Sequence, residues 1–146
     1  MTPYIDVGFL STLLIKTPAR KIAWRNLQKF DPPYALNLLH HLQIENLLAR
    51  CQLDRDDGIK TTGLEGARLW RFYCQEGVFH VNSVGWDAAL RAAISWTQTL
   101  THDVPFLLIL HAALAAESGA TQFLSFDSRA RQFARRAGLK LLPELL

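Results

Sequence analysis

Hydrophobic positions along the chain change their period several times, and short apolar runs alternate with longer stretches of helical spacing. Apolar residues that recur every three to four positions predict amphipathic or buried helices. This spacing covers residues 9–15, 18–30, 38–53, 61–77, 85–100, 102–120 and 127–138. Short apolar runs bounded by turn residues predict strands. These runs lie at residues 3–6, in the later part of 31–39, and at 78–81, 121–126 and 139–143.

The alternation of strands with helices predicts an α/β fold in which the strands run mainly parallel. No repeat or linker interrupts residues 1–146, so we expect a single domain. Thr61 and Asp103 are the expected N-caps of two of the helices. Gly77 and Gly119 are expected to end the same two helices.

The composition is typical of a compact globular protein, with 49% hydrophobic and 20% charged residues. The longest uncharged apolar stretch, residues 104–116, is shorter than the roughly 20 residues that a membrane helix needs, so we expect no membrane association. Asp6 interrupts the first apolar run and no basic stretch precedes it, which argues against a secretory signal. Cys51 and Cys74 form no CxxC pair, which indicates a reducing compartment and a cytoplasmic location.

The formal net charge is +3, and much of the basic charge is close to the C-terminus. The basic residues of this segment are Arg129, Arg131, Arg135, Arg136 and Lys140. Such a run forms either a nucleic-acid-binding face or the solvated flank of a helix, and the sequence leaves both interpretations open. No glycine-rich phosphate loop follows a predicted strand, so a nucleotide cofactor is not indicated.

Two acids close predicted strands, because Asp6 ends the run at 3–6 and Asp127 follows the run at 121–126. If these strands are neighbours in a parallel sheet, both carboxylates project from the edge where ligands bind. Paired carboxylates repel one another unless a cation lies between them, and hard oxygen ligands suit Mg²⁺ or Mn²⁺. Each acid also has a structural interpretation, because Asp6 and Asp127 both stand where they can cap the helix that follows.

Several segments together resemble the PIN-domain family, and in particular the VapC-type toxins of bacterial toxin–antitoxin pairs. They are "YIDVGFLSTLL" near the start, "LLHHLQIENLL" in the middle, Trp86, and "LILHAALAAESGATQFLSFDSRARQFARRAGLKLLP" at the end. The resemblance implies a three-layer α/β/α fold around a mainly parallel twisted sheet. It also implies a homodimer, an antitoxin-like protein partner, and RNA cleavage by an acidic cluster that holds Mg²⁺ or Mn²⁺.

The resemblance carries over only part of the family's acidic site. Two of the four acids are kept, at Asp6 and Asp127. The helical glutamate falls on Gln43, which offers only a neutral carbonyl, and the acid before the Ile-Leu-His motif falls on Leu108. Glu45 follows Gln43 by two positions, which is about 200° around a helix, so it points to the other side.

Two further positions differ from the family pattern or have two interpretations. The arginine expected three residues before the missing acid falls on Pro105. His111 is one turn beyond Leu108, where it either faces the acidic pocket or is a buried histidine with a satisfied hydrogen bond.

Two function classes follow from this reading of the sequence. In the first, the chain is a PIN-like protein with a degenerate active site that acts as a binding module for RNA, for an antitoxin-like peptide or for another copy of itself. In the second, it is an active Mg²⁺- or Mn²⁺-dependent endoribonuclease that uses Asp6, Asp127 and Glu45. The loss of two acids favours the first class.

Overall fold

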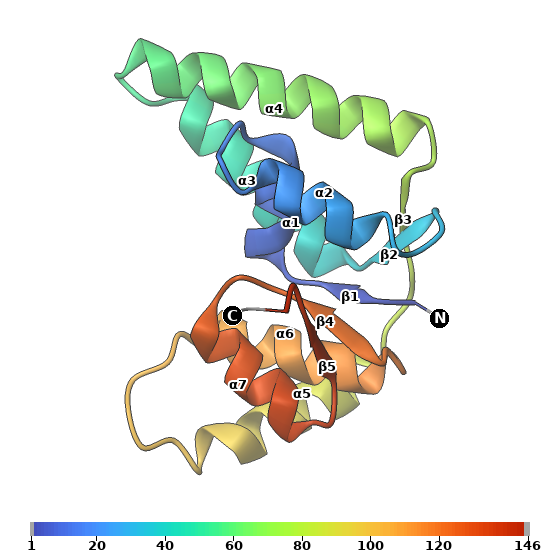
Figure 1. The fold of residues 1–146 in the computed structure, drawn as a ribbon. Coiled ribbons are helices and arrows are strands. Elements are labelled where there is room, and N and C mark those ends of the chain that lie inside the picture. The colour runs from blue at the N-terminus through green and yellow to red at the C-terminus, as the bar shows by residue number, and fades with distance from the viewer. Residues whose placement is uncertain (1, 145–146) are drawn as a thin grey trace. The chain divides into compact units, whose positions relative to one another are not determined.

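The computed structural model describes residues 2–144, and helices alternate with strands along the chain (Figure 1). The strands are β1 (Tyr4–Ile5), β2 (Tyr34–Leu36), β3 (Phe79–Val81), β4 (Gln122–Leu124) and β5 (Lys140–Leu142). The helices are α1 (Val7–Leu14), α2 (Arg20–Leu27), α3 (Leu38–Gln52), α4 (Asp57–Gln75), α5 (Trp86–Thr97), α6 (Phe106–Glu117) and α7 (Ser128–Arg136). Each predicted strand and helix is present, in the predicted order.

The chain divides into two compact units. The first combines the described residues up to Asp6 with those from Ser83 onward, and the second spans Val7–Asn82. β1, β4, β5 and the helices α5, α6 and α7 belong to the first unit. β2, β3 and the helices α1 to α4 belong to the second. The expectation of a single domain stays a prediction.

The first unit is built on a parallel sheet with the strand order β1-β4-β5. α6 packs against both α5 and α7, and its residues from Ile109 to Ala115 are buried. This burial agrees with the apolar character of the helix on every side. Phe133 of α7 joins a buried cluster with Val104 and Ala112. Gly138, at φ +83°, follows α7 in the left-handed conformation that glycine adopts without strain, and the chain then enters β5.

The second unit contains a parallel pair of strands, β2 and β3, in which Tyr34 aligns with Phe79. α3 begins with a reciprocal cap: the Asn37 side chain accepts the N–H of His40, and the His40 ring accepts the N–H of Asn37. α4 packs along α3, and the two backbones approach closely where Gly63 lies against Cys51. A methyl group at position 63 would lie 2.6 Å from the Cys51 Cβ, so the contact requires a glycine.

The mixed α/β class and the parallel strand pairing are confirmed. The finer expectation of three α/β/α layers around one twisted sheet stays a prediction. No helix of the described residues combines the length and the apolar character needed to cross a membrane.

The predicted helix starts were wrong in two places, whereas the predicted ends were right. α4 begins one turn before Thr61, because the Asp56 side chain accepts the N–H of Ile59 and caps the helix there. α6 begins at Phe106 with no side-chain cap, so Asp103 does not cap it. The glycine after each of these helices has a positive φ, +69° at Gly77 and +76° at Gly119.

Candidate functional site

The parallel pairing of β1 with β4 brings the two retained acids to one edge of the first sheet. Ile5 aligns with Leu124, and the amide of Asp6 donates to the Leu124 carbonyl at 2.9 Å. Asp6 therefore follows β1 directly, and Asp127 lies three residues beyond the end of β4. β1 and β4 are neighbours in the sheet, which was the condition for both acids to lie at the same edge.

Ser125 connects the two acids. Its hydroxyl donates to Asp6 Oδ2 at 2.6 Å, and the same oxygen accepts the amide N–H of Asp127 at 3.0 Å. Ser125 is fully buried and Asp6 is 3% exposed. A hydrogen bond to a carboxylate is stronger than one between neutral groups. Removal of one partner leaves a buried polar atom without a hydrogen bond, which destabilises the fold. Ser125 thus fixes the Asp6 side chain and the backbone that leads to Asp127.

Asp127 is the N-cap of α7, as its structural interpretation predicted. Its Oδ1 accepts the amide N–H of Arg129 at 2.8 Å and that of Ala130 at 3.1 Å. Its Oδ2 lies 3.3 Å from the Arg129 guanidinium. Burial raises the pKa of Asp127, but the hydrogen bonds from Arg129 and Ala130 and the charge of Arg129 outweigh it, so the pKa lies below its ordinary value.

Arg131 holds the backbone next to these acids in place through two hydrogen bonds. Its guanidinium donates to the Ser125 carbonyl at 2.7 Å and to the Pro143 carbonyl at 2.9 Å, and the side chain is buried. The amide of Ser125 donates to the Leu142 carbonyl at 2.9 Å. The end of β4 is therefore tied to β5 and to the residue that follows it, and Arg131 has a structural role.

His111 is a buried histidine with a satisfied hydrogen bond, so the structural interpretation of this residue is confirmed. Its Nδ1 lies 2.7 Å from the Tyr4 hydroxyl, and only 1% of the residue is exposed. Tyr4 in turn stacks on Phe123, the residue with which it aligns across the β1–β4 pair. Leu108 is half-buried and packs against the apolar cluster that contains Phe133.

Gln43 and Glu45 lie on α3 in the second unit. Glu45 is exposed and Gln43 is half-buried, which agrees with the predicted difference in direction. The Glu45 carboxylate accepts the indole N–H of Trp70 on α4 at 2.9 Å. Burial, followed by the charge of Glu45, raises the pKa of the Cys74 thiol on the same helix. Glu45 therefore has a structural partner at the contact between α3 and α4.

The donor set at the edge of the first sheet does not fit a tightly bound Mg²⁺ or Mn²⁺ ion. Such an ion takes about six oxygen ligands, and proteins supply it with carboxylates that have free lone pairs. Asp127 already accepts two amide N–H groups and pairs with a cation, and Asp6 accepts the Ser125 hydroxyl. Nowhere within residues 2–144 do three or more His, Cys, Asp or Glu side chains group in a way that could hold a metal ion.

Ser125 and Arg131 are the structural residues of this edge that the sequence analysis did not identify. The signal for Ser125 is its position two residues before Asp127, at which a serine hydroxyl accepts a backbone N–H in a local turn. No short sequence pattern predicts the role of Arg131, because one of its two acceptors, the Pro143 carbonyl, lies beyond β5.

No protein-family model matches the chain, and no curated protein matches it at a significant level. The similarity to PIN domains therefore rests on the sequence segments quoted above and stays a prediction.

We expect Ser125→Ala to lower the free energy of unfolding by about 1–3 kcal/mol, because Asp6 loses a buried donor and the amide of Asp127 loses its acceptor. Chemical denaturation measures this change. Ser128→Ala is the matched control: Ser128 is exposed at the first position of α7, so its substitution should change stability by no more than about 0.5 kcal/mol. Equal effects of the two substitutions would contradict the role given to Ser125.

We expect Asp127→Ala to cost about 1 kcal/mol of stability at neutral pH and Asp127→Asn to cost less, because asparagine also caps helices. The folded pKa of Asp127 is below the unfolded one, so its ionised form stabilises the fold at neutral pH. This contribution is lost as the pH falls below the ordinary aspartate value, about 3.9, and through the folded pKa. Unfolding curves between neutral pH and pH 3 should show the wild type and Asp127→Ala converging. A difference in unfolding free energy that stays constant with pH would show that the charge of Asp127 does not stabilise the fold.

Proposed function

We propose that the chain is a PIN-like module that binds RNA without cutting it. The observation that carries this proposal is the use of both retained acids in the structure itself: Asp6 is bonded by Ser125, and Asp127 caps α7 and pairs with Arg129. Cleavage by a metal-dependent nuclease requires carboxylates that hold a hydrated cation beside the phosphate. A carboxylate that caps a helix and pairs with an arginine, as Asp127 does, has fewer lone pairs to offer a cation.

The charge of the chain supports an RNA ligand. A net charge of +3 favours association with a polyanion, and much of it comes from α7. The basic side chains of α7 have separate surroundings: Arg129 pairs with Asp127 and Arg131 is buried, whereas Arg135 and Arg136 are exposed. Among the described residues neither Arg135 nor Arg136 has a carboxylate partner, and exposed arginines of this kind contact RNA phosphates.

An active Mg²⁺- or Mn²⁺-dependent endoribonuclease is the second candidate. The position of Asp6 and Asp127 at the ends of adjacent parallel strands favours it, because this is the edge at which ligands bind in α/β sheets. The family resemblance adds a homodimer, an antitoxin-like protein partner and a cytoplasmic location to either candidate, and these stay predictions.

The test compares the purified wild-type chain with Asp6→Asn in two assays. Fluorescence anisotropy with labelled single-stranded RNA in EDTA measures binding, and gel analysis with Mn²⁺ and then Mg²⁺ measures cleavage. We expect both proteins to bind RNA with affinities that agree within about twofold, because a metal-independent complex does not need the Asp6 charge. We expect neither protein to cut.

Cleavage by the wild type that disappears in Asp6→Asn would establish the nuclease instead. A wild-type chain that neither binds nor cuts RNA would remove both candidates. Cleavage that persists equally in Asp6→Asn would indicate a contaminating nuclease and would leave the binding assay to decide.

A further inference from the structure

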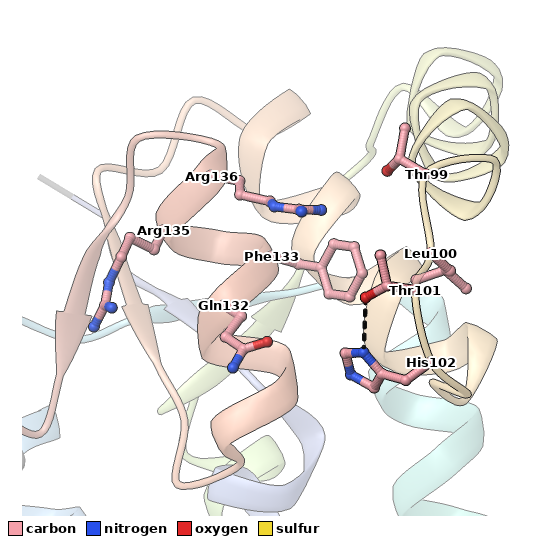
Figure 2. A pocket seen from close by; sticks show the side chains of 8 residues that line it. All are labelled: Thr99, Leu100, Thr101, His102, Gln132, Phe133, Arg135 and Arg136. Carbon is pink, nitrogen blue, oxygen red and sulfur yellow. Dashed lines mark hydrogen bonds between the residues drawn. The ribbon is translucent and has the colours of Figure 1, made fainter.

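A cavity of about 280 Å³ lies in the first unit, between α7 and the segment that follows α5 (Figure 2). It is separate from the acids at the ends of β1 and β4. Its lining residues are Thr99, Leu100, Thr101, His102, Gln132, Phe133, Arg135 and Arg136. The volume is at the small end of the range for ligand pockets, so it suits one small group or part of a larger ligand.

The lining is basic and contains no acid. Among the described residues Arg135 and Arg136 take part in no ion pair, whereas Arg91, Arg129 and Lys140 each have a carboxylate partner. The positive charge is thus not neutralised within the part of the chain that the structure describes.

Arg136 is held over the floor of the cavity. Its guanidinium carbon lies 5.6 Å from the centre of the Phe133 ring, a cation–π distance. Phe133 is 5% exposed and stacks on Trp96 with 6.1 Å between the ring centres, so packing holds the floor in place. Figure 2 shows Arg136 reaching across Phe133 toward the segment that carries Thr99, whereas Arg135 points to the other side of α7.

Polar side chains of the segment that follows α5 line the same cavity as Arg136. The Thr101 hydroxyl lies 3.3 Å from His102 Nδ1. When the hydroxyl is the donor of this hydrogen bond, the Nε2–H of His102 is left to donate to a ligand. The Thr99 hydroxyl donates to the Trp96 carbonyl at 2.8 Å, so it offers a ligand only its lone pair. Gln132, on the α7 side, adds an amide. Polar groups from two elements therefore line one small cavity.

We propose that this cavity binds a phosphate group, with Arg136, His102 and Gln132 as donors and with Leu100 and Phe133 against the apolar part of the molecule that carries the phosphate. The planar guanidinium matches two phosphate oxygens at once, and the other donors serve the remaining oxygens. A metal cation is excluded by the positive lining.

A phosphate group of this kind is found both on a free nucleotide and at the end of an RNA strand. Calorimetric titration of the full chain with AMP, with adenosine and with inorganic phosphate isolates the contribution of the phosphate. Titration with an RNA octamer that carries a 5′-phosphate, and with its 5′-hydroxyl counterpart, tests the strand. Tighter binding of the phosphorylated octamer than of AMP assigns the site to RNA ends, and the reverse order assigns it to free nucleotides.

Arg136→Gln is the test variant, and Arg91→Gln is the matched control. Arg91 is an exposed arginine of α5 in the same unit, paired with Asp87, so both substitutions remove one surface charge. We expect AMP to bind and adenosine not to bind. Arg136→Gln should weaken AMP binding roughly tenfold or more, and Arg91→Gln should change it by less than about twofold.

Adenosine that binds as tightly as AMP would overturn the proposal, as would failure of all phosphate ligands to bind. Equal losses in Arg136→Gln and Arg91→Gln would also overturn it, because they would indicate attraction by net charge alone. AMP binding does not require the chain to bind RNA in the anisotropy assay, so this proposal and the proposed function can fail separately.

Discussion

The hydrogen bond from the Ser125 hydroxyl to Asp6 is the contact on which the carboxyl edge of the first sheet depends. It joins the end of β1 to the end of β4, and the same oxygen holds the amide of Asp127. Asp127 in turn caps α7, so the start of that helix depends on the same short chain of contacts. Because Ser125 and Asp6 are buried, water cannot replace either partner without rearrangement. This constraint makes both acids part of the framework of the fold.

The order and type of the elements were predictable because each one has a clear period and most are bounded by glycine, proline or aspartate. The ends at Gly77 and Gly119 were right because a positive φ strongly favours glycine. The start of α4 was wrong because threonine and aspartate both cap helices, and only the structure shows that the Asp56 side chain accepts the N–H.

The candidate site was predictable only in outline. The acids at the two strand ends, Asp6 and Asp127, followed from the pattern, but their bridge through Ser125 depends on the alignment of β1 with β4. The basic residues of α7 look alike in the sequence, although Arg131 is buried against two carbonyls and Arg136 lies over an aromatic ring. Differences of this kind arise from packing between elements, which a single sequence does not specify.

The central claim is that the retained acids act as structural groups and that the RNA-binding role we propose does not depend on a metal. Calorimetric titration of the purified chain with Mn²⁺ tests this claim most directly, with Asp6→Asn as the comparison. We expect no saturable binding below roughly millimolar Mn²⁺, the range of weak extracellular Ca²⁺ sites, and no difference between the two proteins. A micromolar Mn²⁺ site in the wild type that is lost in Asp6→Asn would contradict it.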